Sequence, residues 1–113
     1  MAYDELLAVR FRDCLGNLEG VSEKRMMGGV CFLLHGNMIG GADRQTDGLG
    51  RFMFRVGKDN EAEALKREGA SVMVHGGRKM GGMIFVGEKY CKDDALRAWI
   101  DLSLSFTKTL PPK

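Results

Sequence analysis

Several short apolar runs in this chain carry large side chains on both faces of the strands that they predict. In one run, Val30, Phe32 and Leu34 alternate with Cys31 and Leu33. Successive side chains of a strand point to opposite faces, so neither face of this strand is polar. The predicted sheet therefore needs cover on both sides, and this requirement limits the chain to folds that supply it.

Three segments show the apolar spacing of amphipathic helices. They are 3–18, 60–68 and 93–107. The first and last have long apolar stripes, whereas the middle one buries only Ala62 and Leu65. Two helices can therefore cover one face of the sheet, and the middle helix is too small to cover the other.

Five strand regions are predicted between these helices, and glycines lie in several of the turns between them. Gly36-Asn37 is a hairpin signal, because both residue types tolerate positive φ angles. Short links favour antiparallel pairing, which predicts a two-layer α+β fold in the order helix, three strands, helix, two strands, helix. No interior linker is present, so residues 1–113 form a single domain. The strand regions are 24–34, interrupted at Gly28-Gly29, then 38–42, 51–56, 71–75 and 83–86, with a glycine-rich turn at 76–82 before the last.

Two nine-residue segments of the chain are alike. Residues 25–33 and 78–86 share the pattern Arg-x-Met-Gly-Gly-apolar-apolar-Phe-apolar. A glycine pair lets a strand bulge or approach another backbone closely. The favoured interpretation is that each pair bends a strand ahead of a buried run, and a duplicated binding element is the alternative. The four structural glycines are Gly28, Gly29, Gly81 and Gly82.

The sequence contains no motif for catalysis, metal binding or cofactor binding. Cys14, Cys31 and Cys91 are far apart and form no C-x-x-C pair, which is typical of reduced thiols in the cytoplasm. His35 and His75 belong to no recognisable ligand set. We therefore expect no catalytic residue, no metal and no cofactor. A small enzyme that uses Cys31 or Cys91 with a histidine is a third hypothesis.

The uncovered sheet face predicts a protein interface. Leaving a large apolar side chain in water forgoes about 1.5–3 kcal/mol of burial, and large apolar patches usually mark interfaces. A homodimer or a protein partner is the expected cover. The alternative is a sheet that curls while a loop covers this face. The residues assigned to the interface are Cys31, Leu33, Met53, Ile84 and Val86.

A basic set of residues supports a second hypothesis, nucleic-acid binding through phosphate contacts. The formal net charge is only +2, from 17 Lys and Arg against 15 Asp and Glu, which gives little long-range attraction. A solvated face or a protein interface is therefore favoured over a nucleic-acid-binding accessory protein. The basic set is Arg51, Arg55, Lys58, Arg78 and Lys79.

No apolar run approaches the ~18 residues of a membrane span, so no membrane partner is expected.

Six short motifs, in the order in which they occur, resemble a known family. They are Arg25-Met-Met-Gly-Gly, Gly36-Asn-Met, Arg55-Val-Gly, Gly77-Arg-Lys-Met, Trp99 and Leu110-Pro-Pro-Lys. Together they resemble the N-terminal domain of TfoX (Sxy), the regulator of natural competence. TfoX regulators commonly carry a second, helical C-terminal domain, and this sequence resembles a stand-alone form that ends without one.

The resemblance implies a two-layer α+β domain similar to the secretion-chaperone fold, without known catalytic residues. It also implies transcriptional regulation of DNA-uptake genes through a protein partner such as the cyclic-AMP receptor protein. Together with the uncovered sheet face, it predicts a non-enzymatic interaction module in the cytoplasm. We expect that module to be a homodimer, to bind a transcription factor, or both.

Overall fold

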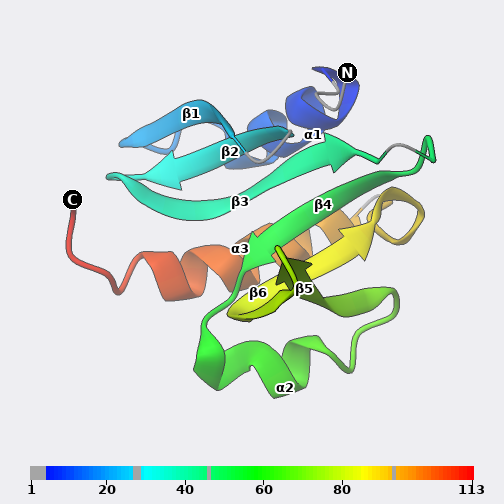
Figure 1. Ribbon diagram of the computed structural model, residues 1–113. Coiled ribbons are helices and arrows are strands. Elements are labelled where there is room, and N and C mark those ends of the chain that lie inside the picture. Colours follow the sequence, from blue (N-terminus) through cyan, green and yellow to red (C-terminus); the bar gives the residue numbers. More distant parts are fainter. Residues whose placement is uncertain (1–4, 27–28, 46, 93) are drawn as a thin grey trace.

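The computed structural model describes residues 5–26, 29–45, 47–92 and 94–113. Its centre is a six-stranded sheet in the order β1-β2-β3-β4-β6-β5, in which every neighbouring pair is antiparallel (Figure 1). The predicted α+β class is confirmed. The strands are β1 Val21–Met26, β2 Gly29–Leu34, β3 Asn37–Arg44, β4 Gly50–Arg55, β5 Ala70–His75 and β6 Arg78–Gly87, and the helices are α1 Glu5–Leu15, α2 Glu61–Ala64 and α3 Asp94–Thr107.

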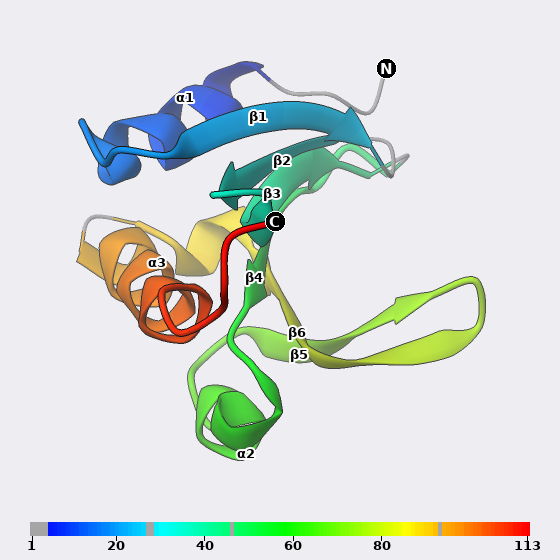
Figure 2. The same ribbon diagram turned by 90° about the vertical axis from the view of Figure 1, so that its left-hand side faces the viewer.

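Helices α1 and α3 cover one face of the sheet, and their apolar stripes build the main core (Figure 2). Phe11 of α1 stacks on Phe32 of β2 with ring centroids 4.5 Å apart. Trp99 of α3 stacks on Phe54 of β4 with centroids 5.2 Å apart. The buried Ser103 hydroxyl lies 2.6 and 2.7 Å from backbone carbonyl oxygens of β3 and β4. Aromatic stacking and one buried hydrogen-bonding group thus fix the helices on the sheet.

The segment 24–34 is two strands, where the sequence predicted a single interrupted one. β1 and β2 pair antiparallel over their whole lengths, so four strands precede α2 where three were predicted. Gly29 is the first residue of β2, and Gly28 is outside the described residues. A Cβ on Gly29 would lie 2.3 Å from the Ala42 carbonyl oxygen, so a glycine is required there. The predicted starts of the first and last helices, at residues 3–4 and 93, are also outside the described residues.

The turn between β2 and β3 is His35-Gly36, one residue earlier than predicted. Both residues have positive φ angles, 50° and 84°, as a two-residue hairpin turn requires. Asn37 is instead buried in β3, where its side-chain amide donates to the Pro111 carbonyl oxygen at 2.9 Å. The Lys113 amide donates to the His35 carbonyl oxygen at 2.8 Å. The segment after α3 is thereby held against this turn.

Strand β3 bends because it contains an extra residue and two glycines. The register with β2 shifts at Ile39, which forms a β-bulge. Cβ atoms on Gly40 and Gly41 would lie 2.1 and 2.3 Å from backbone carbonyl oxygens of β4 and β2. Three strands therefore approach one another more closely than side chains at these positions would permit, and the sheet curls.

The hairpin of β5 and β6 has a shorter turn than predicted. Only Gly76-Gly77 forms the turn, whereas the sequence predicted one over 76–82, and β6 begins at Arg78. Figure 2 shows this hairpin projecting away from the helix layer. The tip of the hairpin is exposed on both strands.

Gly81 and Gly82 lie within β6, where its register with β5 shifts. Gly82 has a φ of 79°, and a Cβ there would lie 2.9 Å from the backbone of Gly57. Its carbonyl oxygen accepts from the Val56 amide at 2.9 Å, and its own amide donates to a Glu61 carboxylate oxygen at 2.8 Å. Gly82 thus joins the hairpin to the chain before α2. A Cβ on Gly81 would meet only a flexible lysine side chain, so this position has no comparable requirement.

The predicted helix 60–68 is a single α-helical turn, α2, which follows a 3₁₀ turn at Lys58–Asn60. Ala64 is buried and Ala62 is exposed, which corrects the predicted buried side. The 3₁₀ turn has about three residues per turn, so it changes which residues face the core. Within the described ranges, no helix has the length and apolarity needed to cross a bilayer.

Candidate functional site

The face of the sheet away from α1 and α3, here called the helix-free face, carries a second apolar cluster. Because the sheet curls, the side chains of this cluster bury one another. The expectation that this face stays open within a single copy is therefore wrong. The alternative was a curled sheet with a loop over this face, and the structure bears out only the curl, because every residue of the cluster belongs to a strand. The buried members are Cys31, Met53, Met73 and Met83, with Met38 and Phe85 half-buried beside them.

Two of the five predicted interface residues lie on the opposite face. Ile84 and Val86 are fully buried in the main core beneath the helices. They pair with the two phenylalanines of β4 that face α1 and α3, a register that the sequence pattern of β6 alone does not define. Cys31 and Met53 lie on the helix-free face, and the half-exposed Leu33 follows Cys31 by two residues on β2. These three residues keep their predicted side of the sheet.

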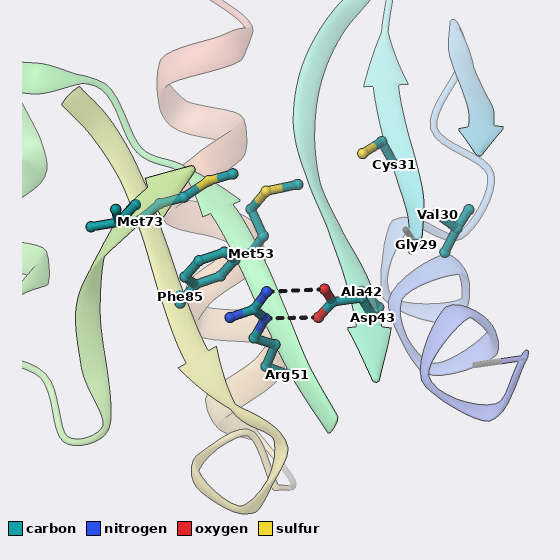
Figure 3. A pocket seen from close by; sticks show the side chains of 10 residues that line it. Gly29, Val30, Cys31, Ala42, Asp43, Arg51, Met53, Met73 and Phe85 are labelled. Carbon is teal, nitrogen blue, oxygen red and sulfur yellow. Dashed lines mark hydrogen bonds and ion pairs between the residues drawn. The ribbon is translucent and has the colours of Figure 1, made fainter. Parts of the chain in front are cut away.

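A small hollow opens on the helix-free face (Figure 3). Its volume is about 50 Å³, whereas small-molecule pockets usually have about 300–1,000 Å³. Thioethers and an aromatic ring form one wall, and a charged pair forms the rim. The hollow therefore has room for the end of one side chain and not for a cofactor. The residues drawn around it include Cys31, Asp43, Arg51, Met53, Met73 and Phe85.

The charged pair at the rim joins β3 to β4. Asp43 and Arg51 are opposite each other in the ladder, and the guanidinium donates Nε to Oδ1 at 2.8 Å and Nη2 to Oδ2 at 3.1 Å (Figure 3). The guanidinium carbon also lies 3.7 Å from the centroid of the Phe85 ring. A two-point guanidinium–carboxylate pair on an aromatic face is geometrically well defined. The pair closes one side of the hollow with a rigid polar group.

The predicted basic set is divided between separate places. Arg51 is occupied by Asp43, whereas Arg55 and Lys58 line a cleft of about 300 Å³ beside Asp59 and Phe106. Arg78 and Lys79 are exposed at the tip of the β5–β6 hairpin. The set therefore forms no continuous basic face.

The thiols are poor candidates for nucleophiles. Burial raises the pKa of Cys31 to about 11 and that of Cys91 to about 12, and it also raises the pKa of the half-buried Cys14. A thiol with such a pKa stays protonated near neutral pH, and the thiolate is the reactive form. Across the part of the chain that the structure describes, no three His, Cys, Asp or Glu side chains are grouped to hold a metal ion.

Sequence reasoning missed three residues around the hollow. Asp43 was not recognised because the predicted strand ends at residue 42, which hides that Asp43 is opposite Arg51 in the ladder. Phe85 lies beside Arg51 because β6 pairs with β4, a long-range pairing that local sequence patterns do not define, and Met73 of β5 lines the same hollow. The one signal available for Asp43 was its charge, opposite to that of an arginine eight residues later.

The comparisons with known proteins agree with the sequence motifs and with this architecture. The model of the TfoX N-terminal domain matches residues 13–107, which is most of the 113-residue chain. Searches of curated proteins and of solved structures returned no significant match. The matched range includes the whole sheet and both residues of the Asp43–Arg51 pair. The chain therefore belongs to the TfoX N-terminal domain family.

Proposed function

We propose that this protein is a non-enzymatic regulator of transcription, of the TfoX type, that controls DNA-uptake genes by contacting a transcription-factor protein. Membership of the TfoX N-terminal domain family carries the proposal. The protonated state of the buried thiols supports a role without covalent catalysis. The hollow on the helix-free face is too small for a cofactor, so we assign no small-molecule ligand to it.

The contact surface in this proposal is the border of the helix-free face. Its half-exposed apolar side chains, Leu33, Met38 and Phe85, surround a buried methionine floor. The Asp43–Arg51 pair adds an oriented polar group at the same border. Partly exposed apolar groups beside a fixed polar pair are typical of protein interfaces. Methionines below them supply a floor that adapts to its neighbours.

The test is a reporter driven by the promoter of a DNA-uptake gene, in cells whose own copy of this gene is deleted. The wild-type chain should change reporter output, and Leu33→Glu should abolish most of that change. A buried charge at an interface centre costs more than about 1 kcal/mol, so a loss of roughly tenfold in partner affinity is expected. Leu6→Glu is the matched control, because Leu6 on α1 is 77% exposed.

Both variants should keep the wild-type circular dichroism spectrum and similar cellular levels. Reporter output that never responds to the wild-type chain contradicts the regulatory role. Output that responds equally to the wild-type chain and to Leu33→Glu contradicts the location of the contact surface.

A second candidate function is nucleic-acid binding. Among the described residues, Arg55, Lys58, Arg78 and Lys79 form no ion pair, which leaves them able to contact phosphates. Asp59 and Glu61 lie close to the first two and reduce the local positive charge. A mobility-shift assay at low salt tests this candidate. A shift that weakens with salt and with Arg55→Glu supports it, and no shift at low salt eliminates it.

A further inference from the structure

The two edges of the sheet differ in charge. β1 forms one edge, and its sequence Val-Ser-Glu-Lys-Arg-Met contains three charged residues in succession. β5 forms the other edge, and its sequence Ala-Ser-Val-Met-Val-His contains no Asp, Glu, Lys or Arg. Charged side chains on an edge strand prevent pairing with another chain, and an uncharged edge is open to it. β5 is therefore the edge at which a further strand can be added.

The backbone of β5 has hydrogen-bonding groups directed to this edge. The Val56 amide donates to the Gly82 carbonyl oxygen, which directs alternate residues of β6 toward β4 and leaves Phe85 directed toward β5. Ser71 is opposite Phe85, so its backbone groups point inward, and those of Val72 and Val74 point outward. Because β5 pairs with β6 on one side only, the Val72 and Val74 amides face the open edge of the sheet.

We propose that β5 pairs antiparallel with β5 of a second copy of this chain, which joins the two sheets edge to edge across a two-fold axis. The axis passes beside Val72, which then lies opposite Val72 of the second copy. Val74 lies opposite Ala70 of the second copy, and the contact occurs twice by symmetry. Val74 is 57% exposed in the single chain, so this pairing covers an apolar side chain as well as satisfying backbone groups.

Charge complementarity favours a second copy as the partner. In this register Gly76 at the hairpin tip lies level with Glu68 of the second copy, just before β5 begins. Arg78 and Lys79 are at the same tip and are exposed, as is Glu68. Within the described ranges, none of these three charged side chains forms an ion pair. Each basic tip therefore meets an acidic residue of the other copy, twice in the dimer.

This inference goes beyond the proposed function, which requires no dimer. The sequence predicted a homodimer from an uncovered sheet face, but the helix-free face is closed within a single copy. The edge of β5, in contrast, stays open in a single copy. The predicted homodimer is thus assigned to a strand edge.

The experiment is sedimentation velocity of the full chain from low to high micromolar concentration. The wild-type chain should pass from monomer to dimer. Val74→Lys should raise the dissociation constant by about tenfold or more, because a charged side chain on the edge strand then replaces the apolar contact with Ala70 of the second copy. Ser22→Lys on the opposite edge is the control, since Ser22 is also exposed, and it should leave the constant unchanged.

A charge exchange tests the register independently of folding. Arg78→Glu and Glu68→Arg should each weaken the dimer, and the double variant should recover most of the loss. A wild-type chain that stays monomeric overturns the proposal. A dimer that Val74→Lys leaves intact also overturns it, as does a double variant no better than the single ones.

Discussion

At the scale of single residues, burial makes two of the thiols poor nucleophiles. Cys31 lies in the apolar cluster of the helix-free face, and Cys91 lies in the main core under the helices. Burial is the largest cause of the raised pKa in both, and for Cys31 the nearby Asp43 carboxylate adds to it. The Arg10 guanidinium opposes the shift at Cys91, without reversing it. Both side chains therefore act as small apolar core groups.

These shifts predict that stability falls in alkaline solution. The folded-state pKa values, about 11 and about 12, exceed the ordinary value of 9.0. As the pH rises through 9.0, the unfolded chain loses these protons first, so the free energy of unfolding decreases with pH until both folded-state thiols ionise. Below the ordinary value the contribution is fully present.

Urea unfolding followed between neutral pH and pH 11 measures this dependence. The control is the double variant Cys31→Ala with Cys91→Ala, which should show a smaller slope. An unchanged slope in the double variant would show that the thiols are not the cause.

At the scale of elements, the apolar pattern predicted which face of β4 contacts the helices but not which face of β6 does. Alternating apolar residues predicted which side of β4 faces the helices, and Phe52 and Phe54 do face them. The same pattern assigned Ile84 and Val86 to the wrong face, because a strand that is apolar on both sides does not define its own orientation. That orientation depends on pairing with distant strands.

The candidate site was harder to predict from the sequence than the elements were. Met53 and Cys31 were placed on the helix-free face by alternation alone. The closure of that face depends on how close the backbones of three strands lie at Gly40 and Gly41, and local patterns carry no such information. Those glycines were interpreted only as part of an apolar strand.

A substitution at Gly41 tests the role of close strand approach. The Cβ in Gly41→Ala would lie 2.3 Å from a backbone carbonyl oxygen of β2, so we expect a destabilisation of about 2 kcal/mol or more. Gly87→Ala is the matched control on β6, because its Cβ would have only an ordinary contact at 3.6 Å with Tyr90. Urea unfolding compares the two variants. Equal stabilities would contradict the close-packed bend.

At the scale of the whole molecule, the chain divides its apolar residues between two clusters on opposite faces of one curled sheet. Helices α1 and α3 cover the first cluster, and the curvature of the sheet closes the second (Figure 2). The two contact surfaces that we propose are then the border of the helix-free face and the edge of β5.

Methionine oxidation by hydrogen peroxide, mapped by mass spectrometry on the dilute chain, tests the closure of the helix-free face most directly. Exposed thioethers are oxidised first, so Met80, which is 37% exposed on the hairpin, should react quickly. Met53, Met73 and Met83 should react much more slowly while the chain stays folded, and as quickly as Met80 after unfolding in urea. Oxidation of these three residues at the rate of Met80 in the folded chain would contradict the account.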